Sequence, residues 1–398
     1  MKKLYETDSM LREIEAEVLS CTQDSQGIRI TLDKSIFFPE GGGQYADEGL
    51  IIVPGNVEPV HVLDGQEIKT DNGRQVVYTV DSEIAPGTTV LCKLNWNLRF
   101  RRMQQHSGEH VLTGIIHNTY GYNNTSFHLS DDEPVTVCFS GPLTQEQIAS
   151  VEHEANRVIY ENLPIVDTYP SKSELENLTY RSKIEIEGQV RIITVGSGSG
   201  IIDVCACCAP HVPSTAYIGM IKIMSFQSYK GGTQLNILCG ERAYEALRDE
   251  HKLLMDMSHE FSTSIEALSE TVITQREKLN NAENELAGIK EAAYLDVIDK
   301  MGAEDVPVFF APDMSAHAMK ITYNRLTDKY DGFCGVFSGD DENGYRFYAG
   351  NPNLNSCELA GVMREKLDAK GGGSKEMIQG KLAKSALEIS VFFKELRS

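Results

Sequence analysis

The chain has 398 residues, of which 41% are hydrophobic, so it is long enough for two to four domains with substantial cores. Its formal net charge of −21 excludes broad, sequence-independent nucleic-acid binding, which needs many Lys and Arg side chains against phosphates. An RNA partner must therefore be bound locally.

The cysteine content argues against a secreted disulfide scaffold. The nine cysteines are an odd number with one tight cluster, so reduced thiols, some bound to metal, are the better interpretation. No run of about eighteen apolar residues predicts a membrane span, and the first residues lack a signal-peptide hydrophobic region. We expect a soluble, cytoplasmic protein of the α+β class.

Residues 1–93 predict a small, mostly antiparallel β domain of barrel-like form. Short apolar runs alternate with turn residues, as in residues 76–80, the turn signal Pro86-Gly87 and residues 88–92. Such punctuation is typical of strands joined by tight turns.

A glycine-rich motif lies inside this β domain, where residues 37–44 read Phe-Phe-Pro-Glu-Gly-Gly-Gly-Gln. Gly41, Gly42 and Gly43 permit positive φ and close approach of a ligand, and Gln44 can both donate and accept hydrogen bonds. These four residues are therefore candidates for substrate binding. In isolation the motif would favour the alternative, a tight hairpin turn without a ligand.

Residues 94–240 predict an α+β domain that opens with a helix over residues 101–120. His106 and His110 are four residues apart, so both imidazoles can point at one ion from the same helix face. Glu109 lies about 100° around that helix from His110, which argues against a role as general base.

Three arginines, Arg99, Arg101 and Arg102, stand just before the paired histidines. They are candidates for holding substrate phosphates near the ion. A solvated basic face is an equally good interpretation of this cluster.

A cysteine cluster in the same domain supplies the other candidate ligands. Cys207 and His211 can complete a tetrahedral set with the two histidines, because thiolate and imidazole together suit zinc. Cys205 and Cys208 compete with Cys207, since any two of three clustered thiols can bind a metal or form a redox pair. Spacing alone does not choose among them.

The rest of this domain predicts alternating helix and strand. Residues 135–139 alternate as a strand, and Thr144 with Gln147 forms a capping box that opens a helix. Further strands are expected at residues 190–195, 221–226 and 235–238.

Residues 241–300 predict a long helix or helical hairpin used in self-association. Its apolar positions recur every seven residues with one four-residue step, at Leu247, Leu254, Phe261, Leu268, Val272, Leu279, Leu286 and Ala293. A homodimer is the expected assembly, and a helix packed on its own domain is the alternative. Residues 301–398 form a last domain of α/β type that carries Gly371-Gly372-Gly373-Ser374, without the spacing of a nucleotide-binding loop.

These motifs, in this order, resemble the editing domain of alanyl-tRNA synthetase and its free-standing relatives, the long-form alanyl-tRNA editing proteins of the AlaX type. The resemblance rests on residues 38–44, on Arg101 through His110, and on Cys207-Cys208-Ala209-Pro210-His211 followed by Ile218-Gly219. The helical segment and the stretch around Gly371 resemble the C-terminal glycine-rich domain of the same proteins, so nearly the whole chain is covered.

The resemblance implies a zinc ion held by His106, His110, Cys207 and His211, and a pocket glutamine at Gln44. It implies hydrolysis of mischarged alanine tRNA, carrying serine or glycine, in trans, since no aminoacylation domain precedes the β domain. His106, His110 and Gln44 are then the expected catalytic residues, and Arg101 and Arg102 join the glycine motif in binding substrate.

The sequence departs from the family pattern at two places. Ala209-Pro210 replaces a usual Gly-Thr, and Thr215-Ala216-Tyr217-Ile218-Gly219 replaces a usual Thr-Gly-Glu-Ile-Gly. Proline removes a backbone N–H, and the lost threonine removes a hydroxyl that could contact substrate. Two alternatives therefore stay open: a zinc hydrolase of another aminoacyl ester, and a catalytically silent, zinc-stabilised tRNA-binding or scaffold protein.

Overall fold

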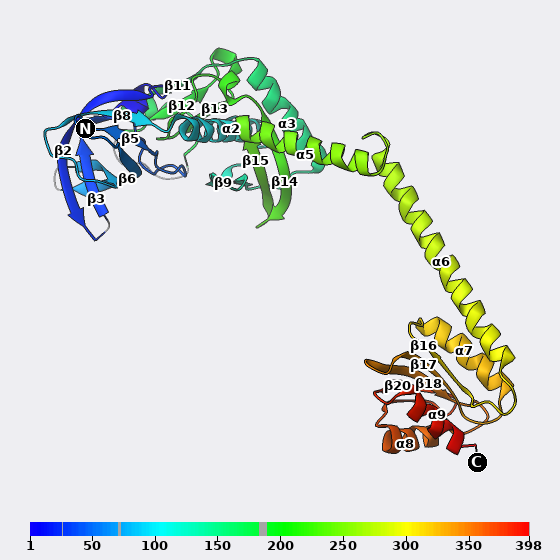
Figure 1. Cartoon of the computed structure of the whole chain (residues 1–398). Helices are drawn as coiled ribbons and strands as arrows, with labels where there is room; N and C mark the ends of the chain where they lie inside the picture. The colour runs from blue at the N-terminus through cyan, green and yellow to red at the C-terminus, as the bar shows by residue number, and fades with distance from the viewer. Residues whose placement is uncertain (26, 71–72, 183–188, 398) are drawn as a thin grey trace. The chain divides into compact units, whose positions relative to one another are not determined.

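The structure is a computed structural model that describes residues 1–25, 27–70, 73–182 and 189–397 (Figure 1). The chain divides into two compact units, Met1–Met255 and Asp256–Ser398. Both contain helices and sheets, which confirms the α+β class. None of the helices in the described part of the chain is both long and apolar enough to cross a membrane.

Six strands at the start of the first unit close into a barrel. In spatial order they are β2 (Glu13–Asp24), β3 (Gly27–Leu32), β7 (Gly73–Val80), β6 (Val60–Thr70), β5 (Gly49–Ile52) and β8 (Thr89–Leu94). Their inward side chains are mostly β-branched or aromatic, such as Val18, Ile30 and Tyr78, and are fully buried. The short elements β1 (Lys2–Lys3) and α1 (Leu4–Thr7) precede the barrel, and β1 pairs with β4 (Lys34–Ser35).

Helix α2 (Trp96–Tyr120) follows the barrel and is the central helix of the first unit. The Asn95 side chain caps its start by accepting from the Leu98 N–H, and Gly121 ends it in the left-handed conformation. The helix begins earlier than the predicted residue 101. Its buried residues include many polar ones, which is why its sequence looks only weakly amphipathic.

Two antiparallel sheets surround α2. One has the order β14 (Ile221–Tyr229), β15 (Gly232–Cys239), β10 (Val135–Phe139) and β9 (Asn124–His128), and the other the order β11 (Ile165–Thr168), β12 (Ile192–Val195) and β13 (Asp203–Ala206). The predicted capping box is present at the start of α3 (Gln145–Tyr160), whose apolar face joins the same core as α2. The remaining short elements are α4 (Lys172–Leu175), η1 (Gly198–Gly200) and η2 (Thr215–Ile218).

A glycine sets the distance between α2 and β13. A Cβ atom at Gly114 would collide with the Ile202 carbonyl oxygen and lie 2.9 Å from the Asp203 Cβ. Only glycine therefore lets the helix approach this strand so closely. The approach brings the side chains of Asp203 and Cys205 within reach of His110, one turn earlier on α2.

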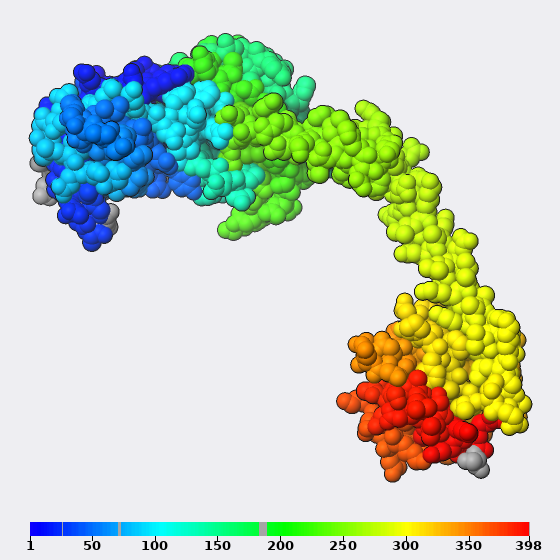
Figure 2. Space-filling model, viewed as in Figure 1, coloured from blue at the N-terminus to red at the C-terminus, as the bar shows by residue number. Residues whose placement is uncertain are grey.

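The predicted helical segment consists of two helices, α5 (Gly240–Glu260) and α6 (Leu268–Lys300). They are separated at residues 261–267, where turns replace the helix. The face of the predicted seam on α6 is open to solvent, with Leu279 59% and Leu286 52% exposed. No other part of the C-terminal unit covers the middle of α6 on the side shown in Figure 2.

The C-terminal unit is built on one five-stranded sheet. Its order is β16 (Val308–Ala311), β17 (Cys334–Asp340), β18 (Gly344–Gly350), β20 (Ile378–Leu382) and β19 (Lys370–Gly373). Helices α7 (Ala316–Lys329), α8 (Ser356–Leu367) and α9 (Ala386–Glu395) contribute to its two buried clusters. The glycine run Gly371–Gly373 lies in the exposed edge strand β19.

Candidate metal centre

Four candidate ligands from two distant segments meet in the first unit. His106 and His110 come from α2, whereas Cys207 and His211 come from the loop after β13. One donor atom from each lies within 4.8 Å of the other three. The Cys207 Sγ is 3.5 Å from the His106 Nε2 and 3.4 Å from the His211 Nε2. The group could hold one metal ion.

The outer ring nitrogen of each histidine has a polar partner. The His106 Nδ1 is 3.1 Å from the Gln44 Oε1, the His110 Nδ1 is 2.9 Å from the Asp203 Oδ2, and the His211 Nδ1 is 3.0 Å from the Ser107 Oγ. Such partners fix ring orientation and leave Nε2 for an ion, as around most histidine-bound metals. The donor set and its surroundings therefore fit a metal.

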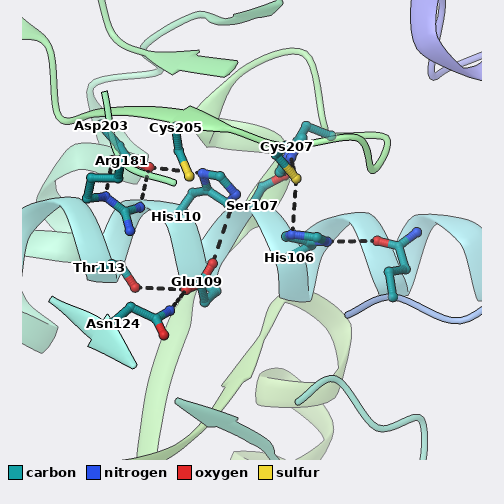
Figure 3. A network of polar contacts seen from close by, with 12 residues as sticks. His106, Ser107, Glu109, His110, Thr113, Asn124, Arg181, Asp203, Cys205 and Cys207 are labelled. Carbon is teal, nitrogen blue, oxygen red and sulfur yellow. Dashed lines mark hydrogen bonds and ion pairs between the residues drawn. The ribbon is translucent and has the colours of Figure 1, made fainter. Parts of the chain in front are cut away.

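Asp203 connects the centre to a partly buried cation, Arg181. Arg181 donates from Nε at 2.8 Å and from Nη2 at 2.7 Å to the two carboxylate oxygens of Asp203 (Figure 3). Burial alone would raise the pKa of Asp203, but the hydrogen bonds from His110 and Arg181 hold it below its ordinary value. Asp203 thus stays ionised and orients His110.

In the protein without a metal ion, burial also determines the charge of two candidate metal-binding residues, Cys207 and His211. Desolvation raises the pKa of the Cys207 thiol well above its ordinary value. Desolvation, with His110 and His106 nearby, lowers the pKa of His211 well below 6.5. The cluster on its own is therefore neutral at these two positions, and a metal must displace the thiol proton to bind.

The glycine-rich motif faces this cluster. Gly41 and Gln44 exchange backbone hydrogen bonds, and Gly42 and Gly43 have φ values of +59° and +80°. A Cβ at Gly43 would lie 2.8 Å from Phe127, whose ring is 5.0 Å from that of His106. The turn therefore needs glycine for both its conformation and its close packing.

Gln44 is the residue of this motif that contacts a candidate metal-binding residue, His106. Its side chain is 1% exposed, and its Nε2 has no hydrogen-bond partner among the described residues. A buried donor without an acceptor costs about 1–3 kcal/mol, so this amide group could donate to a bound molecule.

The arginines before the histidines hold the fold instead of facing the cluster. The buried Arg99 pairs with Asp47 and donates to the Ile36 carbonyl. Arg102 donates to the Ala46 carbonyl and pairs with Asp131. Both therefore fix the segment that carries Gln44.

Arg101 has different partners from its two neighbours. Its guanidinium pairs with Glu241 and Glu245 at the start of α5. Arg101 and Arg102 both pair with carboxylates in this structure, and their predicted role in holding substrate phosphates stays a prediction.

The Glu109 carboxylate lies close to His110, although the two residues are about 100° apart around the helix. Its side chain is buried, and its Oε2 lies 4.0 Å from the His110 Nε2 (Figure 3). A flexible side chain spans the 100° that separates the two residues on the helix. Thr113 at 2.9 Å and Asn124 both donate to its Oε1.

The competing thiols lie at different places. Cys205 forms a second group with His110 and Asp203 whose ligand atoms are also within 4.8 Å of one another. Cys208 instead packs beside the glycine motif, 3.1 Å from where a Cβ of Gly42 would be. Cys207 is the thiol that the structure brings together with all three histidines.

A cavity of about 490 Å³ adjoins this network. Asn124, Arg181, Asp203 and Cys205 are among the residues that line it. It therefore reaches the groups that orient His110 and Glu109.

Comparisons with known proteins agree with this geometry. Residues 190–235 match the family described as the threonyl and alanyl tRNA synthetase second additional domain. This match spans β12 and β13 and includes Asp203, Cys207 and His211.

Three relatives cover more of the chain. The alanyl-tRNA editing protein AlaX-L of Pyrococcus horikoshii is 29% identical over 73% of this chain and 70% of its own length. The alanyl-tRNA editing protein Aarsd1-B of Xenopus laevis is 29% identical over 96% of this chain and 94% of its own. The alanine–tRNA ligase of Pyrococcus abyssi is 25% identical over 97% of this chain but only 43% of its own. The chain is thus a homologue, over most of its length, of the alanyl-tRNA editing proteins of the AlaX-L and Aarsd1 kind, and its residues 190–235 match the second additional domain of threonyl and alanyl tRNA synthetases.

Proposed function

We propose that this protein hydrolyses, in trans, the ester that joins a wrong amino acid to alanine tRNA, with serine as the main substrate and glycine as the second. The observation that carries the proposal is the buried group of three histidines and one cysteine beside the glycine motif. Homology to alanyl-tRNA editing proteins over most of the chain supports the choice of tRNA.

We infer that His106, His110, Cys207 and His211 hold a zinc ion, because three imidazoles and a thiolate are typical zinc donors. When bound, zinc supplies Lewis acidity toward the ester carbonyl. Gln44 donates from its Nε2 to the aminoacyl ester, and the turn Gly41–Gly43 lets the tRNA end approach the backbone. Arg102 positions this turn through Ala46, and Arg101 pairs with Glu241 of α5.

The proposed reaction removes amino acids that the alanine-binding pocket of a synthetase fails to exclude. A pocket shaped for alanine cannot easily exclude the smaller glycine and rejects the hydroxyl of serine only modestly. Hydrolysis after charging supplies the selectivity that binding lacks.

The decisive experiment is single-turnover deacylation of serine-charged and alanine-charged alanine tRNA, with zinc content measured on the same sample. We expect rapid loss of serine and sparing of alanine. Cys207→Ser should abolish the reaction, whereas Cys357→Ser, at an exposed thiol of the C-terminal unit, should not. Full activity in a verified metal-free Cys207→Ser protein would overturn the mechanism.

One observation supports a second candidate function. Four protein donors are typical of structural zinc, whereas catalytic sites usually keep one position open. A zinc-stabilised tRNA-binding protein would bind the tRNA at full zinc occupancy without turnover. A panel of other charged tRNAs and small aminoacyl esters separates this outcome from a hydrolase with a different substrate, which the Ala209-Pro210 turn makes worth testing.

A further inference from the structure

Tyr45 and His128 form an exposed pair of aromatic side chains in the first unit. Their ring centroids are 6.5 Å apart, and the two rings meet edge to face. The Tyr45 side chain is 38% exposed, and His128 on β9 is exposed as well. The proposed reaction has so far used neither ring.

Both rings belong to chain neighbours of residues that contact His106. Tyr45 follows Gln44, whose Oε1 is 3.1 Å from the His106 Nδ1. His128 follows Phe127, whose ring centroid is 5.0 Å from that of His106. Two separate segments, the glycine motif and β9, therefore bring the exposed pair to within one residue of contacts with a candidate metal-binding residue.

The Tyr45 ring is also supported by a fixed cation. The Arg102 Cζ lies over the ring, 5.6 Å from its centroid. Arg102 is itself held, because it donates to the Ala46 carbonyl and pairs with Asp131. A side chain with such fixed contacts loses little conformational freedom when a ligand binds to it. Tyr45 is thus an accessible aromatic surface that is already ordered.

The chemistry of this pair suits an unpaired nucleobase. Proteins bind single-stranded RNA by stacking its bases on tyrosine, histidine and other aromatic side chains. Stacking needs few cations, so it is compatible with a chain whose net charge is −21. A tRNA ends in unpaired nucleotides, and the aminoacyl ester is attached to the last of them. An ester bound near His106 therefore brings these bases close to Tyr45.

We propose that the Tyr45–His128 pair stacks a nucleobase of the unpaired 3′ end of the tRNA and so anchors the end that carries the ester. Arg102 lies on one face of the Tyr45 ring, so the base stacks on the opposite face. The two aromatic residues then act through the nucleotide and do not touch the reacting atoms. For the identity of the RNA, this inference rests on the proposed function.

The test is a double-mutant cycle between the Tyr45 ring and the bases. Binding of uncharged alanine tRNA is measured with the complete tRNA and with the base removed from its last or its last-but-one nucleotide. Removing the ring in Tyr45→Leu, or the base that meets it, should each weaken binding about 5- to 150-fold. At one of the two nucleotides, the combined change should cost no more than either change alone. Additive losses at both nucleotides would overturn the inference.

Conservative variants separate stacking from a structural role of Tyr45. Tyr45→Phe keeps the ring and should bind as tightly as wild type, with the same coupling to the base. A loss in Tyr45→Phe equal to that in Tyr45→Leu would assign the effect to the hydroxyl and overturn the inference. His128→Ala should show a smaller loss that is coupled to the same nucleotide.

Tyr160→Leu is the matched control, because Tyr160 is an exposed tyrosine at the end of α3 in the same unit. It should leave the affinity and the coupling unchanged. Zinc content should be the same in all of these proteins.

The binding cycle involves no hydrolysis, so its outcome is separate from that of the proposed reaction. Coupling without cleavage of any ester would refute the reaction and leave the inference standing, whereas cleavage without coupling would overturn the inference alone. If both hold, Tyr45→Leu should raise KM for serine-charged tRNA by a factor similar to the loss of affinity and leave kcat unchanged.

Discussion

The burial of two helices, α2 and α6, differs in opposite ways from what the polarity of their sequences suggests. Helix α2 contains many polar residues yet is buried along most of its length, whereas α6 carries a regular apolar seam yet is almost wholly exposed. In α2 the polar side chains have partners: His106 contacts Gln44, His110 contacts Asp203, and Ser107 contacts His211. The comparison teaches that buried polar groups mark the candidate metal centre, while exposed apolar groups mark the surface for which we propose a partner.

The largest effect should come from breaking the most buried ion pair of α2, Arg99 with Asp47. Arg99 and Asp47 are both 1% exposed, and Asp47 also accepts from the Phe38 N–H. Arg99→Met leaves a buried carboxylate without its cation, so we expect a loss of about 3–5 kcal/mol in the free energy of unfolding. Urea unfolding measures it.

Arg157→Met is the matched control, because Arg157 pairs with Glu154 and Glu161 on the solvent side of α3. It should change the unfolding midpoint little. Equal losses in the two variants would mean that burial does not distinguish the ion pairs of this unit.

The next prediction concerns Asp203, which contacts the candidate metal-binding residue His110. Asp203→Asn keeps the shape of the side chain but weakens the contacts to His110 and Arg181. We expect zinc affinity to fall about 10- to 100-fold, as for other residues that orient a metal-bound histidine. Chelator competition measures the affinity, and Asp249→Asn on α5, at an exposed ion pair, is the control. Unchanged affinity would show that His110 needs no orienting carboxylate.

A pH effect follows from the lowered pKa of His211. In the metal-free protein, burial keeps His211 neutral while the unfolded chain takes up a proton below its ordinary pKa of 6.5. The unfolded state then binds more protons, so stability must fall as pH falls from 6.5, by up to about 1.4 kcal/mol per pH unit. Thermal unfolding of chelated protein between pH 7 and 5 measures this slope.

His211→Asn removes the titrating group and should flatten the pH dependence of stability. A variant with the wild-type slope would assign the dependence to other groups. Zinc should stabilise the wild type but not this variant, because His211 is one of the proposed ligands.

The four candidate metal-binding residues can be predicted from the sequence, whereas the residues that contact them cannot. His106 with His110 and Cys207 with His211 are short-range pairs whose spacing is visible in the sequence. The suitability of thiolate and imidazole for zinc suggested joining the two pairs, and the family resemblance then implied the same set. Asp203 and Arg181 lie at 93 and 22 residues from their partners, and no local pattern marks them. Asp203 reaches His110 because Gly114 lets α2 approach β13, a consequence of packing that periodicity cannot reveal.

The same limit applies to two predictions about charged residues, Arg102 and Glu109. The expectation for Arg102 followed from its charge, yet a buried guanidinium needs a carboxylate and a carbonyl more than a phosphate. The expectation for Glu109 followed from its helix angle, whereas the length of its side chain decides where the carboxylate lies. Helical position fixes Cβ directions only.

The last prediction concerns the exposed apolar face of α6, and its change should have the smallest effect on the first unit. If the exposed seam of α6 pairs with a second copy of the chain, Leu279→Glu with Leu286→Glu should convert a dimer into a monomer in light scattering, because it places charges in an apolar contact. Both residues lie in the C-terminal unit, so zinc content and single-turnover deacylation should stay at wild-type values. Glu283→Gln with Lys290→Gln, at exposed polar positions of the same helix, should leave the mass unchanged. A wild-type mass of one chain at all concentrations would contradict the dimer, and the apolar residues of α6 would then need a partner other than a second copy.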